Sequence, residues 1–204
     1  MSEPPSYHLN PSTPSWTPPT GTCDTHCHNF WPVDCFPYAE NRTYTPASKA
    51  PKEKLFALHE KIRIERCVLV PAGCQGFHNS VIADAIAAKG AAYLGIALLP
   101  VETKVKELRR HYDLGFRGVR FNYMSYLGKG AAIEDVIAMT PHLADAGMHL
   151  QIHFENKLIR EIAPAPKRSA APVVIDHMGR VDASTGLEQP GFIELRRLLE
   201  SDQV

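Results

Sequence analysis

Residues 21–28 read Gly-Thr-Cys-Asp-Thr-His-Cys-His and place two histidines, His26 and His28, two positions apart. The run is rich in small and β-branched residues, which favours a short β-strand. On a strand, residues i and i+2 point to the same face, so both imidazoles would project together while Cys27 points the other way. Such a pair can hold one metal ion or one polar group of a substrate. A His-x-His pair is a weak signal alone, and its meaning depends on the elements that follow.

Behind this strand the sequence alternates short apolar runs with amphipathic segments. The apolar runs predict strands buried on both faces, at residues 66–72, 93–99, 118–123, 149–154 and 172–177. The amphipathic segments predict helices, at residues 52–62, 79–90, 103–112, 131–145, 157–162 and 191–200. Asn79 stands where it can cap the second of these helices. Six βα units in a row indicate a parallel sheet with helical crossovers.

The fold class predicted is therefore α/β, of the (β/α)8 TIM-barrel type, with about six of the eight βα units. A doubly wound open sheet is the structural alternative. It is less favoured because no Gly-x-Gly-x-x-Gly motif for nucleotide binding follows the first strand.

Composition narrows the class of protein. The chain has 204 residues, of which 44% are hydrophobic and 22% charged, as in ordinary soluble globular proteins. Lysine plus arginine and aspartate plus glutamate number 22 each, so a zero net charge gives no electrostatic reason to bind nucleic acid or an anionic membrane. The sequence shows neither a long apolar run nor a secretory signal at its start. We therefore expect a cytoplasmic protein with neither of those partners, whose five cysteines are reduced thiols.

Two segments stand out from the regular alternation. Residues 1–20 hold six prolines among serines and threonines, which predicts a flexible tail that is disordered or draped over the fold. Residues 21–204 are then one partial barrel domain. The loop at residues 29–52 is rich in aromatic residues and proline, and loops of this length are usually lids or substrate loops.

Polar residues gather where the predicted strands end. Chemistry in barrels of this kind takes place at the carboxyl ends of the strands. The residues at these positions are His26, His28, Gln75, His78, Arg120, Asn122, His153, Glu155, Asp176 and His177. Their convergence favours an active site over a set of individually satisfied histidines.

Four segments carry a resemblance to a known family. They are Asp-Thr-His-Cys-His at 24–28, Gly-Val-Arg-Phe-Asn at 118–122, His-Phe-Glu at 153–155 and Val-Ile-Asp-His-Met-Gly-Arg at 174–180. Together they resemble the amidohydrolase superfamily, and within it the lactonase branch that acts on pyrone dicarboxylates. The resemblance covers residues 21–204. It implies a (β/α)8 barrel and a hydrolase of ester bonds that opens a carboxylated lactone in the catabolism of aromatic compounds.

The resemblance also implies roles for individual residues. His26, His28 and His177 match the histidines that lie around the substrate, and we expect them to polarise the ring ester carbonyl. Arg120 matches an arginine that binds a substrate carboxylate, which suits a bidentate guanidinium, and Tyr44 matches a tyrosine of the loop after strand one. The remaining residues that we expect to contact substrate are Asn122, Tyr126, His153 and Arg180.

The sequence departs from the branch in three ways. The general base implied by the resemblance is an aspartate on strand eight, in a Gly-Thr-Asp-Trp-Pro segment that this sequence does not contain. We therefore expect a truncated or degenerate chain, whose activity can be lost. Tyr126 stands in place of a second arginine, and His153 stands in place of a tyrosine at the end of strand five.

His153 bears on metal dependence. It restores the strand-five histidine of the wider superfamily, so a zinc or manganese ion could be held by His26, His28, His153 and His177. Such an ion would polarise the ester carbonyl and lower the pKa of bound water. In the alternative there is no cofactor, and His153 is a hydrogen-bond donor to substrate. The sequence leaves both open.

Other readings of function and of single residues stay open as well. The chain could be a decarboxylase or hydratase of the same superfamily that acts on an aromatic or conjugated acid, or a non-catalytic remnant whose open sheet edge pairs with a second copy. Asp24 is either an acceptor for a histidine N–H or a strand-end residue, and Glu155 either orients His153 or pairs with a lysine. We expect the other histidines on the surface or on helix flanks, at positions His8, His59, His111, His142 and His149.

Overall fold

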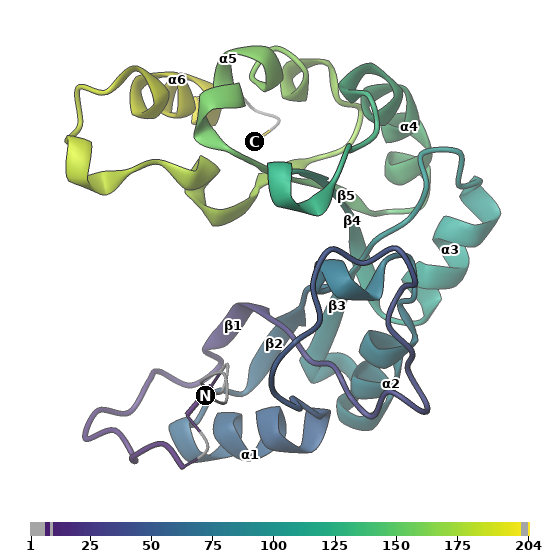
Figure 1. The fold of residues 1–204 in the computed structure, drawn as a ribbon, viewed down its shortest axis with the longest axis vertical. Helices are drawn as coiled ribbons and strands as arrows, with labels where there is room; N and C mark the ends of the chain where they lie inside the picture. Colours follow the sequence, from purple (N-terminus) through teal and green to yellow (C-terminus); the bar gives the residue numbers. More distant parts are fainter. Residues whose placement is uncertain (1–6, 9, 201–203) are drawn as a thin grey trace. The chain divides into compact units, whose positions relative to one another are not determined.

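The structure is a computed structural model that describes residues 7, 8, 10–200 and 204. The chain divides into two compact units (Figure 1). Unit one consists of Met1–Leu98 and Leu114–Phe116, and unit two consists of Leu99–Asp113 and Arg117–Val204. Each unit has three consecutive strands, and the helix Val105–Asp113, which follows the third strand, belongs to unit two. In the described part of the chain, no helix is both long and apolar enough to cross a membrane.

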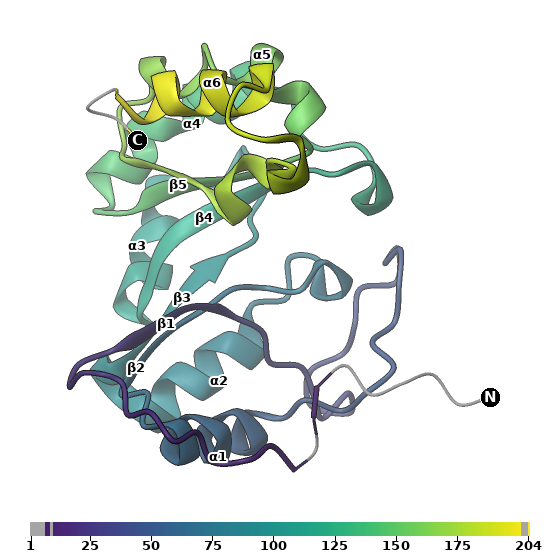
Figure 2. The same ribbon diagram turned by 90° about the vertical axis from the view of Figure 1, so that its left-hand side faces the viewer.

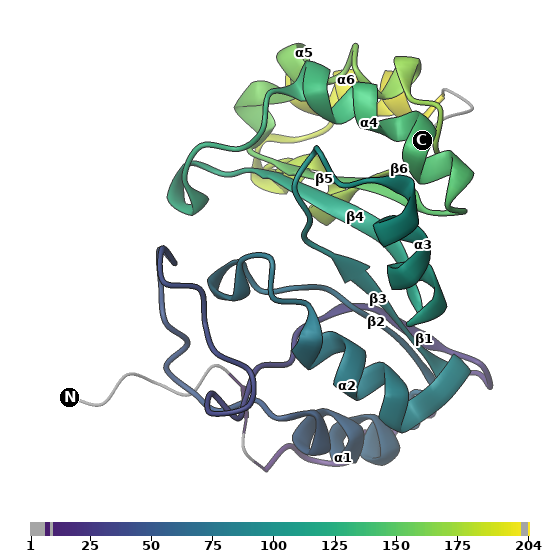
Figure 3. The same cartoon turned by 90° about the vertical axis from the view of Figure 1, so that its right-hand side faces the viewer.

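Unit one is built on a parallel sheet in the order β1-β2-β3. Its elements are β1 (Cys23–Cys27), α1 (Lys52–Ile62), β2 (Arg66–Leu69), α2 (Ser80–Lys89) and β3 (Tyr93–Ala97). Figures 2 and 3 show α1 and α2 on the same side of this sheet. Helix α2 buries an apolar stripe against the sheet, and Gly95 of β3 allows the close approach, because a Cβ there would lie 2.7 Å from Cγ2 of Ile82.

The described part of the proline-rich segment lies on unit one. The hydroxyl of Tyr7 donates to the carbonyl of Lys49 at 2.7 Å, and Nη1 of Arg63 donates to Oγ1 of Thr17 at 2.9 Å. These residues are therefore draped over the fold, one of the two alternatives that their composition allowed. The prediction for residues 1–6 and 9 lies outside the described residues.

In unit two the strands pair in parallel in the order β4-β5-β6. Its elements are α3 (Val105–Asp113), β4 (Phe116–Tyr123), α4 (Ile133–Asp145), β5 (His149–Phe154), α5 (Ile159–Ile162), β6 (Val173–Ile175) and α6 (Pro190–Leu199). The first residue of β4, Phe116, belongs to unit one. Helices α4, α5 and α6 lie along one face of the sheet (Figures 2 and 3). In the β4–β5 register Asn122 lies opposite His153, which brings two of the predicted polar residues together.

Every predicted strand and helix is present, with boundaries that shift by a few residues. The largest correction concerns the sixth strand, which was expected to reach His177. It ends at Ile175, and Asp176–Arg180 forms a tight 3-10 turn. Within this turn His177 and Met178 have φ angles of 49° and 51°, a left-handed conformation that L-residues rarely adopt. The strand therefore ends two residues earlier than predicted, and His177 lies in a turn instead of an extended strand.

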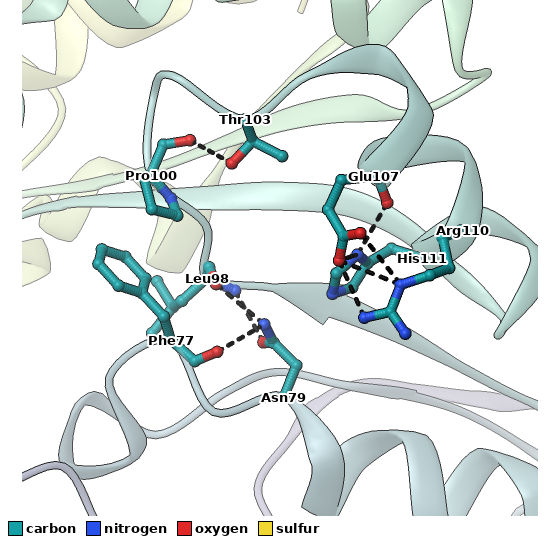
Figure 4. A network of polar contacts seen from close by, with 8 residues as sticks. All are labelled: Phe77, Asn79, Leu98, Pro100, Thr103, Glu107, Arg110 and His111. Carbon is teal, nitrogen blue, oxygen red and sulfur yellow. Dashed lines mark hydrogen bonds and ion pairs between the residues drawn. The ribbon is translucent and has the colours of Figure 1, made fainter.

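Two of the histidines expected on the surface are buried instead. His59 of α1 is 2% exposed and His111 of α3 is 6% exposed. The expectation was wrong for both because each ring lies on the inner face of its helix and finds polar partners there. The Nδ1 atom of His111 lies 3.0 Å from the backbone oxygen of Glu107, whose carboxylate also accepts from Arg110 (Figure 4).

Asn79 differs from its predicted role. It precedes α2, but its side chain makes no capping hydrogen bond. Its Oδ1 instead accepts from the backbone N–H of Leu98 at 3.0 Å, and its Nδ2 donates to the carbonyl of Leu98 at 2.9 Å (Figure 4). The backbone just beyond β3 has no strand partner for these groups, so the asparagine amide satisfies both of them. Asn79 therefore ties the end of β3 to the start of α2.

Replacing Asn79 by serine separates the two roles. Serine caps helices as well as asparagine does, so a capping role predicts almost no change in stability. A bridging role predicts a loss of about 1–3 kcal/mol, because the buried N–H and C=O of Leu98 lose their partners. Urea unfolding of wild type and Asn79→Ser at pH 7 would measure the difference, and equal stabilities would contradict the bridge.

Candidate active site

The histidine pair lies at the end of β1 as predicted. The ring centroids of His26 and His28 are 5.1 Å apart, and the rings meet edge to face at 89°. The Nδ1 atom of His28 lies 2.7 Å from the carbonyl oxygen of Val70. Because a carbonyl can only accept, Nδ1 carries the proton and Nε2 is the basic nitrogen of the neutral ring. The prediction that the two imidazoles lie side by side is confirmed.

Asp24 is an acceptor for a histidine N–H, but the histidine is His59 and not a member of the pair. Its Oδ2 lies 3.2 Å from Nε2 of His59, and its Oδ1 accepts from the backbone N–H of His26 at 3.1 Å. The hydrogen bond from His59 is the main cause that lowers the pKa of Asp24. An ionised carboxylate only accepts, so Nε2 of His59 is protonated and Nδ1 accepts from the hydroxyl of Tyr93 at 2.6 Å.

The long loop of unit one holds Tyr44. The backbone N–H of Phe30 donates to Ala50 at 2.9 Å and closes the two ends of the loop. Burial raises the pKa of Tyr44 to about 12, so its phenol is protonated and is available as a donor at neutral pH. The role of Tyr44 toward substrate stays a prediction.

In unit two, six of the predicted polar residues lie at the carboxyl ends of the strands or in the turn that follows them. They are Arg120, Asn122, His153, Asp176, His177 and Arg180. At their centre Arg120 and Asp176, each 5% exposed, form an ion pair. Asp176 also accepts from the backbone N–H of His177 at 2.9 Å, through Oδ1. The buried guanidinium thus has a carboxylate partner within the protein, in addition to any carboxylate of a substrate.

His153 is the buried imidazole of this cluster. It is 3% exposed, and its ring centroid lies 4.9 Å from that of His177. Its Nδ1 lies 3.1 Å from Oδ1 of Asn122, so Nδ1 carries the proton and Nε2 keeps its lone pair. Among the described residues nothing hydrogen-bonds to Nε2. A buried acceptor without a partner is rare in proteins, and it points to a group that is supplied from outside.

The electrostatics keep this ring neutral. Burial, followed by the positive charge of Arg120, lowers the pKa of His153 to about 3, and Arg180 and His177 act in the same direction. At neutral pH the ring is therefore an acceptor through Nε2. This tautomer suits a metal ligand or an acceptor for a substrate hydroxyl, and it does not suit the donor role that the sequence left open.

The remaining predicted residues have simpler surroundings. Glu155 does not orient His153, because it pairs with Lys157 and accepts from Ser125. Tyr126 is exposed in the short helix after β4. Sequence reasoning missed Tyr123, whose hydroxyl is buried and lacks a hydrogen-bond partner in the described part of the chain. It follows Asn122 directly, and the only sequence signal for it was its place at the end of a strand.

The donor atoms of unit two are compatible with a divalent metal ion. The neutral Nε2 of His153 and the adjacent ring of His177 offer two nitrogens of the kind that zinc and manganese bind. The amidohydrolase pattern of four histidines around one ion stays a prediction, as does the alternative without a metal.

The sequence of the chain matches a known protein family and is similar to two curated proteins. The family model described as "Amidohydrolase" matches residues 23–203, and the chain belongs to this family. It is 33% identical over 197 residues to a 2-pyrone-4,6-dicarboxylate hydrolase of Comamonas testosteroni, with 97% of this chain and 64% of that protein covered. It is 35% identical over 191 residues to a 4-sulfomuconolactone hydrolase of Rhizobium radiobacter, with 93% and 64% covered. The chain thus spans about 64% of the length of these relatives.

One solved structure is similar to this chain in fold and in sequence. It is a probable 2-pyrone-4,6-dicarboxylic acid hydrolase of Acinetobacter baumannii with citric acid bound, and its TM-score against this chain is 0.77. The two sequences are 25% identical, and the alignment covers 88% of this chain and 66% of the other. The match confirms the predicted TIM-barrel type with six βα units, and the family match confirms the resemblance read from the four sequence segments.

The buried, neutral His153 predicts an acid-sensitive stability. Its folded pKa lies below the usual value of 6.5, so between pH 7 and pH 5 the unfolded chain takes up a proton at this position and the folded chain does not. The contribution is complete above pH 6.5 and is lost as the pH falls toward 3. Between pH 7 and pH 5, protonation at this position should cost wild type about 2 kcal/mol of unfolding free energy. The variant His153→Gln cannot take up this proton and should not show that loss. Urea unfolding at both pH values measures this, and identical pH dependence in the two proteins would refute it.

The ion pair of unit two predicts strong non-additivity. Asp176→Leu leaves the buried charge of Arg120 uncompensated and should destabilise the fold by about 3–5 kcal/mol. The double variant Arg120→Met, Asp176→Leu removes both charges and should regain most of that loss. Unfolding free energies of the singles and the double test this, and a double variant as unstable as the sum of the singles would exclude a tight pair.

Proposed function

We propose that this chain hydrolyses the ring ester of a small lactone that carries one or more carboxylates. The observation that carries the proposal is the buried Nε2 of His153, which lacks a partner in the described part of the chain and lies beside His177 and two arginines. The Nε2 lone pair can accept a hydrogen bond from the attacking water, and the two arginines suit an anionic substrate. The alternative reading, a set of separately satisfied histidines, does not account for this atom.

The relatives support this substrate class. The curated relatives are named as hydrolases of 2-pyrone-4,6-dicarboxylate and of 4-sulfomuconolactone, and both substrates are lactones with anionic groups. The solved relative holds citric acid, which is a tricarboxylate. Because this chain spans about 64% of those curated proteins, the transfer of their activity is our proposal.

The residues of unit two take the following roles. Arg120 and Arg180 supply the positive charge that attracts the substrate carboxylates, and Asp176 holds the guanidinium of Arg120 in place. Asn122 fixes the tautomer of His153, whose Nε2 is then an acceptor for the attacking water. Tyr126 is an exposed, adaptable contact at the edge of this group.

The remaining assignments follow the family pattern. His26, His28 and His177 polarise the ester carbonyl on which the attacking water adds, and Tyr44 donates to a substrate carboxylate. If a divalent ion is bound, His153 and His177 are among the residues that hold it, and it would act as a Lewis acid on that carbonyl.

The wider setting follows from the same reasoning. We propose that the substrate is a free small molecule, that the protein is cytoplasmic, and that nucleic acid and membranes are not its partners. Residues 21–204 would form the catalytic portion of the chain, and residues 1–20 a tail.

Binding and turnover test the proposal separately. The purified chain is mixed with 2-pyrone-4,6-dicarboxylate or 4-sulfomuconolactone, binding is followed by calorimetry, and ring opening by loss of the lactone absorbance. We expect His153→Ala to lower kcat/KM by about 100-fold, as for loss of a group that contacts the reacting centre. Arg180→Met should raise KM by about tenfold through the loss of one charge contact.

The control is His142→Ala, a half-buried histidine of α4 outside the site, which should match wild type. Folded protein that neither binds nor opens either lactone would overturn the proposal. Release of carbon dioxide from the substrate, in place of ring opening, would show a decarboxylase instead.

A further inference from the structure

Unit one holds a second cluster of metal-ligating side chains, made of Cys27, His59 and Cys67. Its donor atoms all lie within 4.8 Å of one another, and the two sulfurs are 3.0 Å apart. Cys67 is 1% exposed and Cys27 is half-buried. The three residues come from consecutive elements, β1, α1 and β2, which lie side by side in Figures 1 and 3. None of them takes part in the proposed lactone chemistry.

A register shift in β1 brings the cluster together. Asp24 is paired with Cys67 and Cys27 with Leu69, so β1 advances three residues where β2 advances two. Residues three apart on a regular strand point to opposite faces, but this irregularity lets both Asp24 and Cys27 reach His59. A bulge of this kind re-aims a side chain without lengthening the strand.

The register also argues against a direct bond between the sulfurs. Cys27 lies opposite a residue two positions beyond Cys67, which puts the two Cα atoms about 8 Å apart for standard strand spacing. Disulfides rarely span more than about 7 Å between Cα atoms. Two thiols that converge from such a distance are better placed to share one ligand than to bond to each other.

The imidazole is already prepared as a ligand. The carboxylate of Asp24 accepts from Nε2 of His59, which leaves Nδ1 with the lone pair that now accepts from Tyr93 at 2.6 Å. A carboxylate behind the protonated nitrogen of a metal-binding histidine is a common arrangement at zinc sites. A metal would take the place of the tyrosine hydroxyl, and the bond to Asp24 would remain.

We propose that Cys27, His59 and Cys67 bind one zinc ion that ties β1, α1 and β2 together. Two thiolates and one imidazole are zinc ligands, and a water molecule in the open fourth position completes the tetrahedron. Each thiol releases its proton to solvent as its sulfur binds. Zinc–sulfur bonds of about 2.3 Å set the sulfurs about 3.8 Å apart, so the pair opens by less than about 1 Å. The inference does not depend on the proposed lactonase activity.

Cobalt reports this site directly. The full chain, freed of metal with a chelator under reducing conditions, is titrated with Co²⁺ and its absorption recorded. We expect one equivalent to produce a near-ultraviolet sulfur-to-cobalt charge-transfer band with tetrahedral visible bands, and Zn²⁺ to displace them. Ions held only by histidines give no charge-transfer band from sulfur, so binding at the lactone site is distinguished.

Variants test which side chains bind the cobalt ion. Cys27→Ala and Cys67→Ala should each weaken Co²⁺ binding by more than about 100-fold, beyond the effect usual for an outer contact. Asp24→Asn should weaken it by about 10–100-fold with the band retained. The matched control is Cys74→Ala, which removes an equally buried thiol of unit one outside the cluster and should leave the titration unchanged.

Three results would overturn the proposal. Folded wild-type protein could show no sulfur-to-cobalt band, the band could survive the loss of Cys67, or it could disappear in Cys74→Ala. Mass spectrometry adds a further check, because a loss of two hydrogens that maps to Cys27 and Cys67 under mild oxidation, without metal uptake, would identify a disulfide pair instead. Circular dichroism confirms that each variant is folded before its titration is interpreted.

Discussion

The buried ion pair between Arg120 and Asp176 is the interaction on which the polar cluster of unit two depends. Moving either charge out of water costs several kcal/mol, and the cost is offset only when the partner is held in place. The pair meets this condition because Arg120 lies in the regular strand β4 and Asp176 starts the turn after β6. The same carboxylate holds the backbone of His177, so one interaction fixes both the charge and the adjacent imidazole.

The positive charge of Arg120 also affects the protonation of His153. The guanidinium of Arg120 and the low polarity of the interior both disfavour a second positive charge, so the imidazole is neutral over most of the pH range. Asn122, opposite His153 in the strand register, selects the tautomer. Position along the strand, charge and hydrogen bonding therefore agree on one state of this ring, with its lone pair at Nε2. A ligand that brings a donor or a metal ion meets a site already organised for it.

Much of this could be read from the sequence, and the exceptions have physical causes. Arg120 and Asn122 are two residues apart on one strand, so their common face followed from strand geometry alone. The left-handed turn at His177 could not be predicted, because positive φ angles are expected mainly at glycine. In this turn only Gly179 is a glycine, yet His177 and Met178 also have positive φ angles. Tyr44 and Tyr126 lie in loops, whose side-chain surroundings depend on tertiary packing that no periodicity encodes.

His59 shows a different kind of error, because its signal was present in the sequence. The apolar stripe of α1 consists of Leu55, Leu58 and Ile62, and His59 continues it at i+4 from Leu55. His59 is buried while the apolar residues of the stripe are half-buried, so its ring must find polar partners, which Asp24 and Tyr93 provide. In the same way, His111 lies three residues after the buried Leu108. The helical periodicity of the sequence thus predicts a buried position for both histidines, whereas their residue type alone predicts the surface.

The two faces of β1 and the residue after it carry different functional groups. His26 and His28 alternate with Cys27, so one short strand presents imidazoles on one face and a thiol on the other. The donor atoms of Cys27, His59 and Cys67 lie within 4.8 Å of one another, so the thiol of β1 faces α1 and β2. The alternation therefore places the candidate active-site histidines and the proposed metal ligand Cys27 on opposite faces of one backbone.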